Sequence, residues 1–233
     1  MNVRALKSAV AALALLVAAP AAFAQDLTIG VRAGPDSIDP HWSTLGSQAE
    51  TLRHIFDTLV DVDEKLQLKP GLATSWTPID DTTWEFKIRE GVKFHDGSPL
   101  TAKDVKFSIE RIPVVTGPMP MTLYTKYVET AEVVDDYTLR VKTKGVAPSL
   151  PNDFTRLFVV SANTGMEARN EQFNSGEKAI GTGPYKFVSW QPKGDLVLVR
   201  NDDYWGGAPH WKNVVRKEIA DDAARVAALR SGQ

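Results

Sequence analysis

The sequence contains no cysteine among its 233 residues. Disulfides, a thiolate nucleophile and cysteine-based metal sites are therefore excluded. A basic excess is also missing, because 27 lysines and arginines stand against 29 aspartates and glutamates. Nucleic-acid binding, which requires a basic face, is not predicted. The protein has to depend on a hydrophobic core, and a chain of this length can bury one.

Long apolar runs are confined to the N-terminus. Residues 9–19 consist of alanine, leucine and valine, follow Arg4 and Lys7, and precede an A-x-A cleavage site at residues 22–24. Because this run is shorter than the roughly 20 residues of a membrane-spanning helix, we predict a signal peptide over residues 1–24 rather than a membrane anchor. Cleavage leaves an exported globular chain of 209 residues with a net charge of −4, and no membrane insertion is expected after cleavage.

Periodicity predicts a mixed α/β fold. Alternating apolar residues predict a strand with one buried face over residues 83–89. Further strands are expected over residues 26–31, 132–142 (a hairpin), 185–190, 196–200 and 214–219. Ser47 and Glu50 have the spacing of a capping box, and helical spacing continues through Leu52, Ile55, Phe56, Leu59 and Val60. Other helices are predicted after Thr101, over about 164–173, and after Asp221.

One stretch resembles a small active site. Residues 92–111 (VKFHDGSPLTAKDVKFSIER) bring His95, Asp96 and a serine close together. Asp96 and Gly97 have turn chemistry, and Thr101 is a helix cap. Adjacent residues of an extended chain point to opposite faces, so His95 and Asp96 make a poor catalytic pair. We interpret the stretch as a turn that leads into a helix.

Other motifs for catalysis or cofactors are missing. The four histidines include no pair at helical spacing, and no H-E-x-x-H or G-x-S-x-G occurs. Residues 181–184 (GTGP) lack the lysine of a phosphate-binding loop. We predict no catalytic residue, no metal site and no cofactor. A secreted hydrolase that uses His95 or His41 is kept as the alternative.

Two loops are candidates for binding. Trp42, one of six tryptophans, lies in the loop before the first predicted helix, where an aromatic side chain suits a cleft. Residues 112–127 form a long loop with three prolines, and long loops in compact domains are often functional.

Several segments, in order, carry a family resemblance. They are residues 68–76 (LKPGLATSW), 83–111, 181–187 (GTGPYKF), 201–207 (NDDYWGG) and 225–233 (RVAALRSGQ). The chain resembles the extracellular solute-binding proteins, family 5, of ABC importers, which bind dipeptides, oligopeptides or nickel.

The resemblance implies an α/β, periplasmic-binding-protein-like fold of type II with an extra inserted domain. Residues 26–68 and 182–233 are expected to form a discontinuous first lobe, and residues 69–181 the inserted α/β domain. Members of the family are much longer, so the second lobe is expected to be absent and the chain to be a fragment. A complete small structural module is the alternative.

The resemblance also implies a function and a site. The protein is expected to bind a peptide or another small solute in the periplasm and deliver it to the transmembrane subunits of an ABC permease, without catalysing a reaction. The first loop is expected to contribute Trp42, Ser43, Thr44, Leu45 and Gly46. The second, residues 118–124, is expected to contribute Met119, Met121 and Tyr124. Peptide, nickel chelate, glutathione, sugar and opine ligands all remain open.

Overall fold

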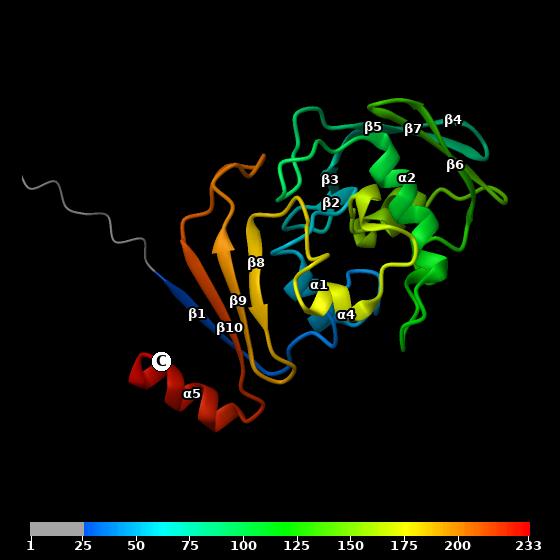
Figure 1. Cartoon of the computed structure of the whole chain (residues 1–233). Coiled ribbons are helices and arrows are strands. Elements are labelled where there is room, and N and C mark those ends of the chain that lie inside the picture. The colour runs from blue at the N-terminus through cyan, green and yellow to red at the C-terminus, as the bar shows by residue number, and fades with distance from the viewer. Residues whose placement is uncertain (1–25) are drawn as a thin grey trace, which may run out of the picture.

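The computed structural model describes residues 26–233, which contain two four-stranded sheets and one two-stranded sheet (Figure 1). The predicted signal peptide lies outside the described residues. Within residues 26–233, no helix is both long enough and apolar enough to cross a membrane.

The first sheet joins the beginning and the end of the described chain. Its strand order is β1 (Leu27–Val31), β10 (Asn213–Glu218), β9 (Asp195–Arg200) and β8 (Tyr185–Trp190). β1 pairs in parallel with β10, which places Leu27 opposite Val214. The alternation of β9 buries Leu196 and Leu198 on one face of the sheet, where α1 (Gly46–Leu52) and α4 (Asn170–Asn174) pack. α5 (Asp222–Ser231) lies against the opposite face, beside Thr28 and Gly30.

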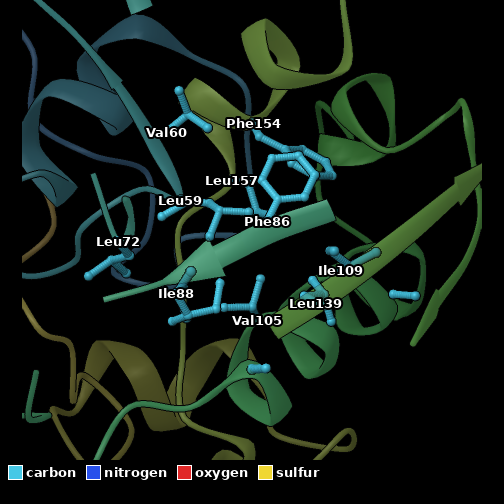
Figure 2. Close-up of a cluster of buried hydrophobic side chains, with 14 of the residues drawn as sticks. Leu59, Val60, Leu72, Phe86, Ile88, Val105, Ile109, Leu139, Phe154 and Leu157 are labelled. Atoms are coloured by element: carbon cyan, nitrogen blue, oxygen red, sulfur yellow. The ribbon is translucent and has the colours of Figure 1, made fainter. Parts of the chain in front are cut away.

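The second sheet is antiparallel throughout. Its order is β4 (Ala73–Asp80), β5 (Thr83–Ile88), β7 (Thr138–Thr143) and β6 (Val128–Asp135). α2 (Ala102–Arg111) packs against this sheet through Val105 and Ile109, which meet Phe86 and Leu139 in a buried cluster (Figure 2). β2 (Val60–Val62) and β3 (Leu68–Pro70) form the small sheet.

Short helical turns complete the fold. α3 is Leu150–Asp153, and 3-10 turns occur at Ile112–Val114, Met121–Tyr124, Phe154–Arg156 and Ala162–Thr164.

The two buried clusters share elements of the chain. α2 contributes Val105 and Ile109 to the cluster of the second sheet, and Phe107 to the cluster of the first. Leu59 belongs to the former cluster and Phe158 to the latter. Each cluster therefore contains residues from both sides of the expected boundaries at 68/69 and 181/182. The division into lobe and insert stays a prediction.

Most predicted elements are confirmed. The strands lie within a few residues of their expected positions, and Thr101 and Asp221 occupy the N-cap positions of α2 and α5, although the Thr101 side chain itself accepts no cap hydrogen bond. The Asp104 carboxylate accepts the backbone N–H of Thr101 at 2.8 Å. The Asp221 carboxylate accepts the backbone N–H of Ala224 at 2.7 Å.

The prediction of one helix from Ser47 to Val60 is wrong. α1 begins at Gly46 and ends at Leu52, and Ser47 does not cap it. Beyond Leu52 the chain turns and pairs with distant strand-like segments: the Leu59 N–H donates to the Leu157 carbonyl at 2.9 Å. These apolar residues are buried, but in a turn and a strand, because pairing distant in sequence outweighs local spacing.

The helix expected over residues 164–173 is also shorter than predicted. Only Asn170–Asn174 is α-helical. Gly165 has a φ of +85°, a backbone conformation that interrupts a right-handed helix and that glycine adopts without strain.

Candidate ligand-binding site

The structure brings the two predicted binding loops together. Ser43 and Met119 form a parallel β-bridge, and the Thr44 N–H donates to the Met119 carbonyl at 3.1 Å. Residues about 75 positions apart thus lie side by side. This contact is possible because Gly117 has no side chain: a Cβ at Gly117 would lie 1.7 Å from the Trp42 carbonyl oxygen.

The exposure of the predicted site residues is uneven. Met119 is 44% exposed. Trp42, Thr44, Leu45 and Tyr124 are half-buried, and Gly46 is exposed.

Two side chains of the predicted site are buried. Ser43 and Met121 are each only 2% exposed, so neither side chain is available to a solute. Met121 opens the 3-10 turn Met121–Tyr124, and its side chain enters the cluster beneath the second sheet. The Ser43 hydroxyl accepts the N–H of Leu45 at 3.2 Å and holds the first loop.

A buried ion pair fixes the first loop against α2. Arg111 Nη2 lies 2.6 Å from Asp39 Oδ2, and Nη1 lies 2.9 Å from Oδ1. Arg111 is 0% exposed and Asp39 is 1% exposed. A bidentate pair has a single geometry, and removing one partner of such a buried pair leaves an uncompensated charge. The loop that carries Trp42 is therefore held rigidly.

His41 belongs to the same buried network. Arg111 Nη1 donates to His41 Nδ1 at 3.0 Å, so Nε2 carries the proton and donates to the Phe158 carbonyl at 2.9 Å. Burial first, and then the charge of Arg111, lower the pKa of His41 to about 4. His41 is therefore a neutral structural residue at physiological pH.

His95 holds the glycine-rich crossing. The Gly181 N–H donates to Nδ1 at 3.3 Å, and Nε2 donates to the Gly183 carbonyl at 3.0 Å. Burial lowers the pKa of His95 to about 4. Both nitrogens of His95 are occupied by backbone groups, whereas those of His41 are occupied by the Arg111 side chain and the Phe158 carbonyl. In this structure, neither histidine of the hydrolase alternative has a ring nitrogen available for a substrate.

Two hollows border the paired loops. The first, which we call the Tyr124 hollow, has a volume of about 580 Å³ and is lined by Gly46, Tyr124, Arg53, Thr155 and Arg156, among others. The second has a volume of about 350 Å³ and is lined by Trp42, Val114, Val115 and residues 166–171, among others. Three of the eight predicted site residues line these hollows: Gly46 and Tyr124 line the first, and Trp42 lines the second.

The sequence prediction missed the residues that complete these hollows. Arg156 and Thr155 lie between apolar residues in a segment that shows only a short apolar run, and no motif marks them. They line the hollow, whereas Phe154 and Leu157, which flank them in the chain, are buried in the core (Figure 2). Elsewhere in the described part of the chain, no three histidine, aspartate or glutamate side chains gather in a way that would hold a metal ion.

Comparison with known proteins supports this interpretation of the fold. A family model described as "Bacterial extracellular solute-binding proteins, family 5 Middle" matches residues 67–233. The oligopeptide-binding protein AppA of Bacillus subtilis is 32% identical over 216 residues, which cover 89% of this chain and 39% of AppA. The glutathione-binding protein GsiB of Pectobacterium atrosepticum is 27% identical over 224 residues, which cover 94% of this chain and 43% of GsiB.

Solved structures give the same result. AppA in complex with a nonapeptide superposes with a TM-score of 0.81 at 29% identity, covering 89% of this chain and 42% of AppA. DppA of Helicobacter pylori in complex with the peptide STSA superposes with a TM-score of 0.77 at 29% identity, covering 89% of this chain and 45% of DppA.

These matches confirm the predicted fold class, that of the type II periplasmic binding proteins. The described residues correspond to a partial first lobe, and the chain spans less than half the length of the curated relatives that it matches. The family model matches well over half of the chain. We conclude that the chain belongs to the bacterial extracellular solute-binding proteins, family 5.

Proposed function

We propose that this chain provides one wall of the binding site in the substrate-binding component of an ABC importer. The observation that carries the proposal is the pairing of residues 42–46 with Met119, which joins two half-exposed loops into one surface. The bound solute is a peptide or a similar small molecule, since AppA and DppA are similar structures that hold peptides and GsiB is a glutathione-binding protein.

The chemistry of the loops suits an extended peptide. Such a ligand is held partly through its backbone, as an added strand, which requires no particular side-chain sequence. Leu45, Met119 and Trp42 offer apolar contacts, and a methionine adapts to different side chains. The buried pair of Asp39 and Arg111 keeps this wall in one conformation, which reduces the entropy lost on binding.

Location and partners follow from the same proposal. Residues 1–24 direct export, and the mature protein works in the periplasm with the transmembrane subunits of a permease. Residues 26–68 and 182–233 belong to the first lobe, and residues 69–181 form its insert. A hinge motion that brings a second lobe over the solute signals occupancy to the permease. No reaction takes place, because both ring nitrogens of each candidate histidine already have a hydrogen-bond partner within the protein.

The test uses the protein encoded by the complete gene. We expect native mass spectrometry to find a co-purified peptide or small solute, and calorimetry to measure its reversible rebinding after removal. Trp42→Ala is expected to weaken rebinding by about tenfold, the effect of losing one well-packed aromatic contact. The solute should be recovered unchanged after incubation.

Two results contradict the proposal. One is turnover of the solute that His95→Ala abolishes, which would favour the secreted hydrolase. The other is a protein that retains no solute from bacterial cells and binds none of a mixed peptide library.

A further inference from the structure

The Tyr124 hollow contains one arginine without a protein partner. Three charged residues line it: Glu50, Arg53 and Arg156. Glu50 lies 3.0 Å from Arg216, and Arg53 lies 2.9 Å from Asp61. Of the hydrogen bonds and ion pairs formed among residues 26–233, none involves the guanidinium of Arg156.

Arg156 is held in place by its neighbours in the chain. It ends the 3-10 turn Phe154–Arg156. Phe154 and Leu157, on either side, are 0% exposed and belong to the core (Figure 2). The backbone at Arg156 is therefore fixed, and its half-buried side chain borders the hollow. A guanidinium carries five N–H donors, and removing them partly from water without an acceptor is unfavourable.

A second donor borders the same hollow. Tyr124 packs its ring against the core of the second sheet, and its hydroxyl makes no hydrogen bond within the described part of the chain. A cation and a phenol hydroxyl in one concave surface, both without a protein acceptor, are complementary to an oxyanion. The neighbouring carboxylate of Glu50 is engaged with Arg216.

We propose that Arg156 binds a carboxylate of the transported solute and that Tyr124 donates a second hydrogen bond to it. This inference rests on the proposed function and narrows it to solutes that carry a carboxylate. Arginine matches the planar carboxylate with two parallel hydrogen bonds, which a lysine cannot do. The carboxylate is either the C-terminus of a peptide or an acidic side chain, and the two sources share the same chemistry.

The test distinguishes these sources with four tripeptide probes and the protein encoded by the complete gene. Trialanine and its C-terminal amide differ in the terminal carboxylate. The amides of Ala-Glu-Ala and Ala-Gln-Ala differ in a side-chain carboxylate. In one of the two pairs, we expect wild-type protein to bind the probe with the carboxylate at least ~10-fold more tightly than its neutral partner, which is the effect of a charged hydrogen bond. Arg156→Gln should abolish the preference, and Arg156→Lys should retain part of it.

Arg140→Gln is the matched control. Arg140 pairs with Glu85 at 3.0 Å on the second sheet, away from the hollow, and its loss should leave the preference unchanged. A preference that survives Arg156→Gln, or wild-type protein that binds both members of each pair equally, overturns the inference while peptide binding stands. Failure of wild-type protein to bind any probe or its co-purified solute overturns the proposed function, and the inference falls with it.

Discussion

At the scale of single residues, buried polar groups form hydrogen bonds between segments that are far apart in the sequence. Asp39, His41 and Arg111 tie the first binding loop to α2, and His95 ties a turn to the crossing at residues 181–183. Most of their buried polar atoms have a specific partner, which limits the penalty for burying them, and Arg111 Nε, which has no hydrogen-bond partner, is the exception. Residue types that perform chemistry in enzymes are structural here.

The two buried histidines predict a loss of stability in acid. Their pKa values fall from 6.5 in the unfolded chain to about 4 in the folded protein. Below pH 6.5 the unfolded chain therefore binds more protons than the folded one. The stabilisation is complete above pH 6.5 and is lost as the pH falls towards 4, by at most about 3 kcal/mol for each histidine.

Urea unfolding at pH 7 and at pH 4.5 measures this effect. We expect the unfolding free energy of wild-type protein to fall between the two values, and His95→Gln to reduce that fall. His210→Gln, which changes an exposed histidine, is the control. The same dependence on pH in wild-type and His95→Gln protein would contradict the assignment.

At the scale of elements, close approach of backbones decides the binding wall. The loop of residues 39–46 and the loop of residues 112–124 meet at one β-bridge, and Gly117 lies directly on the Trp42 carbonyl. The 3-10 turn that follows withdraws Met121 from the wall and leaves Tyr124 at its edge. The shape of the wall depends on this contact.

Replacing Gly117 with alanine is expected to separate the two loops. The added Cβ would overlap the carbonyl oxygen of Trp42, so one loop has to move. Overpacking of this kind costs about 1–3 kcal/mol of stability, and we expect a loss of solute affinity of about tenfold in addition, because Trp42 and Met119 are displaced. Urea unfolding and calorimetry measure the two effects.

Gly145→Ala is the matched control for this substitution. A Cβ at Gly145 meets no atom within 4 Å, so both stability and affinity should remain close to wild type. Unchanged solute affinity in Gly117→Ala protein would show that the contact between the loops does not shape the site.

At the scale of the whole molecule, the helices differ strongly in how much of their surface is buried. The two buried clusters meet at α2, which contributes to both. α5, in contrast, contains no buried residue, and its Leu229 is 80% exposed. An isolated helix of this length is marginal in water, since most helical stability comes from tertiary packing.

Hydrogen exchange of the 233-residue chain tests this difference. α2 and α5 both contain ten residues and both begin with a capped turn, but only α2 is buried. We expect the amides of α5 to exchange at least ~10-fold faster than those of α2, because opening α5 exposes little apolar surface. Equal protection of the two helices would contradict this expectation.

Local patterns in the sequence determined much of the fold. The alternation at residues 83–88, the hairpin that ends in β7, and the caps at Thr101 and Asp221 act over a few neighbouring residues, so they can be recognised without a structure. The motifs between residues 68 and 233 were sufficient to identify the family, which the match to residues 67–233 confirms.

Only the tertiary structure decided the rest. Residues 53–60 have helical spacing but pair with residues 157–159, since contacts between distant segments can outweigh local preference. The burial of Met121, the tautomers of His41 and His95, and the position of Arg156 beside Tyr124 likewise depend on segments far apart in the chain. A local sequence pattern does not predict such contacts, because the residues become neighbours only when the chain folds.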